Sequence, residues 1–207
     1  MKRRDGPSRR PQREIRKQRF LIVCEGEVTE PEYFEDTRHL LRLLVDLEII
    51  PGGDPKRLVE RAVEKKNESA ASARKRSDDY LRYDQVWCVF DVDEHGRLRD
   101  ALQQARDNEI SVAVSNPCFE LWALLHFQDQ NAYIERDKVR ELCKKHMPGY
   151  RKQLPCSALL PFYKDAQRRS VDLDRRHKAD GTEGANPSTG VYKLMEEMRS
   201  QPAWERA

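Results

Sequence analysis

Short apolar runs and two-faced segments alternate along the first two thirds of the chain. Four apolar runs end in turn residues or charges and predict buried strands, at 20–24, 45–50, 83–90 and 110–114. The segments between and after them carry apolar residues at helical spacing and predict helices, at about 30–44, 54–76, 98–108 and 118–127. This regular order predicts an α/β fold, a three-layer sandwich with a mainly parallel central sheet.

The last third of the chain has a different pattern, because its apolar residues recur only at helical spacing. It predicts helices at about 136–146, 159–177 and 191–199. At 207 residues the chain is long enough for one well-packed core. We therefore expect a single α/β domain over 20–207, with residues from about 129 onward forming a helical C-terminal extension packed on it.

The junction between the first strand and its helix holds the first candidate site residues. Glu25 and Glu27 flank Gly26 directly after the apolar run. A carboxylate at the carboxyl end of a buried strand lies where open α/β sheets place their sites. The helix that follows is predicted to begin with a T-x-x-E capping box, formed by Thr29 and Glu32.

A second acidic strand end follows the run at 83–90, in the sequence Asp91-Val92-Asp93. Side chains two residues apart leave an extended backbone on the same side, so Asp91 and Asp93 can share a cation. A hard ion such as Mg²⁺ binds carboxylate oxygens, and Glu25 completes the set if the two strands are neighbours. Three carboxylates so placed repel one another unless a cation lies between them. The alternative is a solvated acidic turn before the next helix.

Glu120 is the only carboxylate of an otherwise apolar helix at 118–127. Buried carboxylates are almost always paired or bound to metal, so Glu120 is a candidate ligand. The alternative is a glutamate near the start of a helix that is satisfied by the helix dipole and by a nearby arginine.

Two pairs of small polar residues are candidates for binding phosphate. Ser115 and Asn116 follow the strand at 110–114, and Ser188 and Thr189 precede the last helix. Exposed amides and hydroxyls at such positions hold anions. Ordinary capping of the following helix by the same residues is the alternative.

Positive charge is concentrated at the N-terminus. Residues 1–19 hold nine Lys or Arg against two acids, whereas the whole chain has a net charge of +3. With Pro7 and Pro11, this basic arm is expected to be disordered. It could hold a nucleic-acid backbone by releasing counterions, or act as a solubilising leader or a docking tail.

Hydropathy and cysteine usage favour a cytoplasmic protein with no membrane partner. No apolar run approaches the length of a membrane span, and the basic N-terminus lacks the apolar core of a signal peptide. Five cysteines without a C-x-x-C pair indicate reduced thiols. Cys143 and His146 have a spacing that zinc could use, but the sequence offers no obvious second ligand pair, which favours a plain helix.

Four motifs, in order along the chain, resemble one family. They are C-E-G-E-x-T-E-P-x-Y-F at 24–34, V-F-D-V-D-E at 89–94, S-N-P-C-F-E-L-W-x-L-L-H-F at 115–127 and N-P-S-T at 186–189. Together they look like the RloB-like family, over nearly all of the chain after the basic arm. That family is similar to TOPRIM domains, the metal-dependent unit of topoisomerases, primases and OLD-type nucleases. The resemblance implies a TOPRIM-like fold with Glu25, Asp91 and Asp93 as catalytic residues.

The resemblance also implies a biological setting. Members of the family are associated with prokaryotic anti-phage, abortive-infection or restriction-type loci, often beside an ATPase. This chain has no G-x-x-x-x-G-K-[ST] motif, so the ATPase would be a separate partner. The chain also lacks the tyrosine-bearing domain of a topoisomerase, and its length argues against a primase, which leaves a nuclease.

The working hypothesis is therefore a Mg²⁺- or Mn²⁺-dependent nuclease acting on DNA or on RNA, tRNA included. Asp91 and Asp93 would hold the metal, with Glu25 as a further ligand or as general acid and base. Glu27 and Glu120 would support a second metal or orient the first ligands.

Two other hypotheses stay open. One is a non-catalytic nucleic-acid-binding or effector-docking subunit, in which the acidic cluster is structural and the basic arm and the polar helix at 54–76 make the contacts. The other is a phosphatase or transferase built on D-x-D, which fits less well because Glu94 and His95 stand where that motif needs threonine or valine. The oligomeric state is equally open, a homo-oligomer included.

Overall fold

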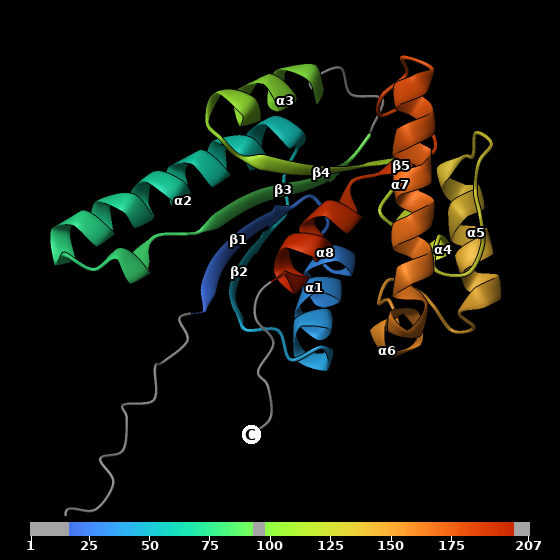
Figure 1. The fold of residues 1–207 in the computed structure, drawn as a ribbon, viewed down its shortest axis with the longest axis horizontal. Coiled ribbons are helices and arrows are strands. Elements are labelled where there is room, and N and C mark those ends of the chain that lie inside the picture. Colours follow the sequence, from blue (N-terminus) through green and yellow to red (C-terminus); the bar gives the residue numbers. More distant parts are fainter. Residues whose placement is uncertain (1–16, 93–97, 201–207) are drawn as a thin grey trace, which may run out of the picture.

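The computed structural model describes residues 17–92 and 98–200 (Figure 1). The first elements along the chain are β1 (Gln18–Cys24), α1 (Thr29–Leu40), β2 (Val45–Pro51), α2 (Pro55–Arg76), the 3-10 turn η1 (Asp79–Leu81), β3 (Gln85–Asp91), α3 (Leu98–Asp107) and β4 (Ser111–Asn116). The later elements are α4 (Glu120–Leu124), α5 (Arg136–His146), α6 (Cys156–Leu159), the 3-10 turn η2 (Leu160–Phe162), α7 (Tyr163–Ala179), β5 (Ser188–Thr189) and α8 (Val191–Arg199).

The strands form one sheet in the order β2-β1-β3-β4-β5. β1 to β4 run parallel, and the short β5 pairs antiparallel with β4. This confirms the predicted α/β fold with a mainly parallel sheet. β5 is missing from the sequence prediction, because two residues carry no readable alternation of apolar and polar positions.

Both faces of the sheet are buried, as a three-layer arrangement requires. On β1, Phe20, Ile22 and Cys24 belong to one hydrophobic core, whereas Leu21 and Val23 belong to another on the opposite face. All five side chains are fully buried. This is why the first strand reads in the sequence as a continuous apolar run.

Helices cover the two faces and stand beyond one edge of the sheet. α2 and α3 pack on the core that contains Leu21, while α1 and α8 pack on the core that contains Phe20 (Figure 1). α4 to α7 stand beyond the carboxyl ends of the strands (Figure 1). The C-terminal helices therefore have two places, because α8 lies on a face of the sheet and α5 to α7 lie beside the strand ends.

The start of α1 differs from the prediction. Its N-cap residue is Val28, which forms no side-chain cap hydrogen bond. The hydroxyl of Thr29 instead donates to the carbonyl of Lys152, at 2.9 Å. The predicted capping box of Thr29 and Glu32 is therefore wrong, since a contact distant in sequence takes the hydroxyl that the box would use.

The starts and ends of other helices follow local chemistry to different degrees. α2 begins as predicted, because the carboxylate of Asp54 accepts a hydrogen bond from the amide of Arg57. α1 ends four residues early, just before Arg42 takes a positive φ of 52°. The predicted helix at 159–177 is divided into α6, η2 and α7, with Pro161 in η2, where its nitrogen has no hydrogen to donate.

The predicted helix at 118–127 is shorter than expected. Only 120–124 form α4, and the chain then tightens into turns in which the amides of His126 and Phe127 donate to carbonyls three residues earlier. Within the described part of the chain, none of the helices is both long enough and apolar enough to cross a membrane.

Candidate active site

The topology of the sheet creates a crevice between β1 and β3. From β1 the chain crosses to β2 on one side, and from β3 it continues to β4 on the other side. Loops leaving the carboxyl ends of β1 and β3 therefore diverge, and ligands of doubly wound proteins bind at such a switch point. β1 and β3 are direct neighbours, with Cys24 paired to Val89. The sequence-based prediction that Glu25 lies near Asp91 required these two strands to be neighbours.

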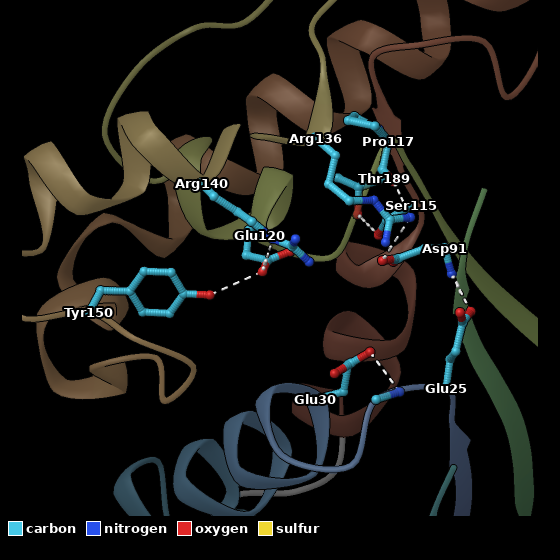
Figure 2. A network of polar contacts seen from close by, with 11 residues as sticks. Glu25, Glu30, Asp91, Ser115, Pro117, Glu120, Arg136, Arg140, Tyr150 and Thr189 are labelled. Atoms are coloured by element: carbon cyan, nitrogen blue, oxygen red, sulfur yellow. Dashed lines mark hydrogen bonds and ion pairs between the residues drawn. The ribbon is translucent and has the colours of Figure 1, made fainter. Parts of the chain in front are cut away.

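Glu25 and Asp91 lie at these two strand ends and contact each other. The amide of Glu25 donates to the carbonyl of Val89, at 3.0 Å. One carboxylate oxygen of Glu25 accepts a hydrogen bond from the amide of Asp91, at 3.1 Å (Figure 2). The sheet pairing thus brings together two of the three residues predicted to be catalytic, although they are 66 positions apart.

The carboxylate of Asp91 is largely buried, with 14% of its side chain exposed. Arg136 from α5 lies 3.7 Å from it and also donates to the carbonyl of Pro117, at 3.1 Å (Figure 2). Burial raises the pKa of Asp91 well above its usual range, the negative charge of Glu30 raises it further, and Arg136 opposes both. Asp91 is thus a desolvated carboxyl group whose charge is only partly compensated.

Glu30 is a site residue that the sequence analysis did not name. It stands in the first turn of α1, is 5% exposed, and its carboxylate accepts a hydrogen bond from the amide of Gly26, at 3.1 Å (Figure 2). A Cβ atom on Gly26 would lie 2.0 Å from a carboxylate oxygen of Glu30, so only glycine leaves room for this contact. Burial raises the pKa of Glu30, and the charges of Glu120 and Glu25 raise it as well.

Glu120, at the start of α4, is the best satisfied of the four carboxylates. It is 7% exposed and accepts hydrogen bonds from Arg140, at 3.0 Å, and from the hydroxyl of Tyr150, at 3.1 Å (Figure 2). Burial alone would raise the pKa of Glu120, but a backbone hydrogen bond and the charge of Arg140 together hold it below its usual range. Arg140 is therefore the nearby arginine that the alternative interpretation of Glu120, as a satisfied glutamate at a helix start, requires.

These residues line a cleft of about 550 Å³ that has two differently charged sides. The acidic side is formed by the loop after β1, the end of β3 and the start of α4. The basic side is formed by α5 and the segment that follows it. The cleft contains the cations Arg136, Arg140, Lys144, Arg151 and Lys152.

Of the other predicted site residues, Glu27 lines the same cleft, and Ser115 is the direct partner of Asp91 in the β3–β4 ladder. Glu27 is exposed, and its carboxylate lies beside Gly52 in the turn after β2. Ser115 and Thr189 are buried and hydrogen bonded to each other at 3.0 Å. The side-chain amide of Asn116 donates to the carbonyl of Gly184, at 2.9 Å.

The predicted phosphate-binding residues are therefore held in contacts within the protein. Ser188 pairs with Asn116 in the β4–β5 ladder. Ser188 and Thr189 line a second cleft of about 320 Å³ beside α7, separate from the one that contains Asp91. Their role in binding phosphate stays a prediction.

Asp93, the third predicted catalytic residue, lies outside the described residues, and so does Glu94. Within residues 17–92 and 98–200, no group of three or more Asp, Glu, His or Cys side chains is arranged to hold a metal ion. The chemistry of the acidic side nevertheless fits a hard divalent cation, because Glu25, Glu30 and Asp91 offer oxygen donors in a partly buried setting. Burial first, and the negative charge of neighbouring carboxylates second, raise the pKa values of Glu30 and Asp91, and a bound cation would favour the ionised form of both groups.

No pattern in the sequence pointed to the basic side of the cleft. Arg136 and Arg140 occupy adjacent turns of a helix that was predicted with correct bounds, and their i, i+4 spacing signals a common face. The spacing does not show, however, that this face of α5 lines the cleft. Glu30 could have been found more easily from the sequence, because it lies within the motif at 24–34 and stands five residues after Glu25.

The sheet order and the cleft define a doubly wound α/β protein whose candidate site lies at the topological switch point. A family model described as RloB-like protein matches residues 20–198. The chain therefore belongs to the RloB-like family, as its four sequence motifs indicated. A search of curated proteins and a search of solved structures each gave no match.

Proposed function

We propose that the chain is a divalent-metal-dependent nuclease that hydrolyses phosphodiester bonds in DNA or RNA at the cleft between β1 and β3. The observation that carries the proposal is the convergence of Glu25, Glu30 and Asp91 opposite a row of cations. Phosphodiester hydrolysis needs both kinds of charge, because the metal requires anionic ligands and the substrate is itself an anion.

The residues of the acidic side would hold the cation. Asp91 and Glu25 are the described ligands in this proposal, with Asp93 as the third. When bound, Mg²⁺ or Mn²⁺ would supply charge stabilisation on the phosphoryl oxygens and a more acidic water. Glu30 has a raised pKa and can therefore hold a proton closer to neutral pH than an ordinary glutamate, which suits a general acid or base.

The residues of the basic side would orient the substrate. Arg136 and Arg140 carry planar guanidinium groups, which bind phosphate oxygens in pairs. Both contact carboxylates of the cleft, Asp91 and Glu120 respectively. A cation on the acidic side would take over part of that charge compensation and leave the guanidinium groups available to phosphate.

The test is cleavage of plasmid DNA and of tRNA by the purified chain, in Mg²⁺, in Mn²⁺ and in EDTA. We expect cleavage that requires metal and is lost in Asp91→Asn. The matched control is Asp84→Asn, just before the opposite end of β3, where the carboxylate accepts from the amide of Arg19. Metal-dependent cleavage of equal rate by both variants would refute the assignment of Asp91.

A non-catalytic nucleic-acid-binding subunit is the second candidate function. It is favoured by the ion pairs Arg136–Asp91 and Arg140–Glu120, which compensate two of the carboxylates without metal. In that case both arginines would be structural. Binding of nucleic acid that does not change with Mg²⁺, and is not accompanied by cleavage under any metal, would favour this candidate over the nuclease.

The biological setting is proposed from the family resemblance alone. We expect the chain to act in a prokaryotic anti-phage, abortive-infection or restriction-associated system, together with a separate ATPase. If the isolated chain does not cleave, adding the proposed ATPase partner, where one is encoded nearby, is the decisive experiment. Cleavage that appears only with ATPase and ATP would place the chain as the regulated nuclease subunit.

A further inference from the structure

The basic side of the cleft has a regular arrangement along α5. Arg136, Arg140 and Lys144 are spaced by four residues, so they lie on one face of this helix, and all three line the cleft. The distance along the helix axis from the first to the third is about 12 Å at 1.5 Å per residue. Arg151 and Lys152 extend the same side beyond the end of α5.

The cations of this row differ in what they already contact. Arg136 and Arg140 are paired with carboxylates on the acidic side. The side chains of Lys144, Arg151 and Lys152 are exposed and take part in none of the ion pairs found among residues 17–92 and 98–200. The row therefore leads from compensated arginines beside Asp91 to cations that face solvent.

The opposite face of α5 provides a contrast. Lys138 and Lys145 both pair with Glu141, at 2.7 and 2.9 Å. Neither lines the cleft. Neighbouring lysines on one helix, Lys144 and Lys145, thus differ in one respect that matters, which is whether the ammonium group faces the cleft or an acidic neighbour.

The described walls of the cleft offer no platform for stacking bases. Their aromatic residues, Phe119 and Tyr150, are 2% and 7% exposed, and the hydroxyl of Tyr150 is bound to Glu120. Proteins that read single-stranded bases do so largely by stacking them on exposed aromatic rings. Recognition here must therefore act through the backbone and tolerate any sequence.

The depth of the acidic side limits the form of the substrate. The side chain of Glu30 is buried in the cleft, and that of Asp91 is largely buried, with 14% exposed. The phosphates of a duplex lie on a stiff rod, which bends only over many base pairs. A single strand can bend and lower one phosphate to these carboxylates.

We propose that Lys144, Arg151 and Lys152 form a track for the phosphates of one nucleic-acid strand and guide that strand to Asp91. The track acts on the backbone, so it accepts single-stranded DNA and RNA and discriminates against duplex. The role of the track rests on the proposed nuclease function. Its test does not, because the experiment measures binding in the absence of cleavage. From Lys144 to Arg136, about 12 Å along α5, the row of cations continues from the track to the ion pair with Asp91.

The experiment measures binding of labelled oligonucleotides of the same sequence by fluorescence anisotropy, in EDTA and over a series of salt concentrations. The probes are single-stranded DNA, single-stranded RNA and the DNA duplex. The full-length chain is compared with Lys144→Glu and with its neighbour control Lys145→Glu. Thermal unfolding of each variant verifies that the fold is retained.

We expect single strands to bind more tightly than duplex, and Lys144→Glu to weaken binding at least about tenfold, as loss of a hydrogen bond to a charged group does. The slope of log K against log salt should fall by about 0.7 for each phosphate that the variant no longer neutralises. Lys145→Glu should bind nearly as well as the unaltered chain. Arg151→Glu and Lys152→Glu should each repeat the result of Lys144→Glu.

Three results would overturn the proposal. The first is equal binding by Lys144→Glu and Lys145→Glu, and the second is equal affinity for duplex and single strand. The third is binding of an acidic peptide such as polyglutamate in place of nucleic acid. Track-dependent binding without cleavage in any metal, even with the ATPase partner and ATP present, would uphold the track and refute the nuclease. Cleavage at equal rates by Lys144→Glu and Lys145→Glu would uphold the nuclease and refute the track.

Discussion

At the scale of single residues, the site depends on carboxylates whose ionised form is disfavoured by burial. Asp91 and Glu30 are both desolvated, and the negative charge of Glu30 raises the pKa of Asp91 further. Among the described residues, the cation that lowers the pKa of Asp91 most is Arg136, at 3.7 Å. Buried groups with strongly perturbed pKa values concentrate at functional sites, which is why these residues, rather than the better satisfied Glu120, are central to the proposed activity.

The fit between Gly26 and Glu30 gives a prediction about stability. Gly26→Ala places a Cβ atom against the carboxylate of Glu30, which must turn away and give up its hydrogen bond from the amide of residue 26, so the free energy of unfolding should fall by about 1–3 kcal/mol. In a Glu30→Ala background the clash is gone, so the same substitution should cost less than about 0.5 kcal/mol. Urea unfolding of the four proteins measures both values. An equal cost in both backgrounds would contradict the close approach of these two residues.

The buried imidazole of His126 should make the stability of the protein depend on pH. Its Nδ1 donates to the carbonyl of Trp122, at 2.9 Å, while Nε2 is buried without a partner among the described residues, and burial lowers its pKa to about 4. Between pH 6.5 and pH 4 the imidazole of His126 is protonated in the unfolded chain but stays neutral in the folded chain. The free energy of unfolding should therefore fall by roughly 3 kcal/mol between pH 6.5 and pH 4 on account of His126, at 1.36 kcal/mol per pKa unit.

The measurement is chemical unfolding at several pH values for the unaltered chain and for His126→Asn, which keeps a donor for the carbonyl of Trp122. The variant should lose less stability than the unaltered chain on acidification. The exposed His146→Asn serves as a control for removing an imidazole. An identical pH dependence in His126→Asn and in the unaltered chain would show that His126 is not buried as a neutral group.

At the scale of elements, α2 is the helix whose start is defined most locally. Asp54 accepts from the amide of Arg57, and Pro55 follows at the first helical position. Asp54→Ala should therefore lower stability by about 1 kcal/mol, whereas Asp54→Ser keeps a capping oxygen and should lose much less. A shift in the urea midpoint with an unchanged m value measures this. Equal stability of the two variants would contradict the capping role.

The comparison of α1 with α2 shows which helix starts can be predicted from sequence. Asp54 caps α2 through a residue three positions away, so the chemistry lies within the motif. Thr29 donates to Lys152, which is 123 positions away, and no local pattern can reveal that contact. The bounds of α5 and α8 were predicted because both helices present clear apolar faces, whereas β5 is too short to have one.

At the scale of the whole molecule, the sequence predicted the sheet and the placement of Glu25 and Asp91 at its strand ends, but neither Glu30 nor the basic side of the cleft. A run of buried residues that ends in Glu25 or in Asp91 places both carboxylates at the same edge of any parallel sheet. Only the strand order makes β1 and β3 neighbours. Arg136 lies 45 positions after Asp91 and reaches it because α5 stands beyond the strand ends (Figure 1), an arrangement set by packing rather than by any motif.

The central claim is that the ends of β1 and β3 form a divalent-cation site. Calorimetric titration of the full-length chain with Mn²⁺ tests it most directly, using Asp91→Asn and, as the control near the opposite end of β3, Asp84→Asn. We expect the unaltered chain and Asp84→Asn to bind Mn²⁺, and to gain thermal stability from it by mass action, while Asp91→Asn does neither. Binding of Mn²⁺ by Asp91→Asn with undiminished affinity would contradict the claim.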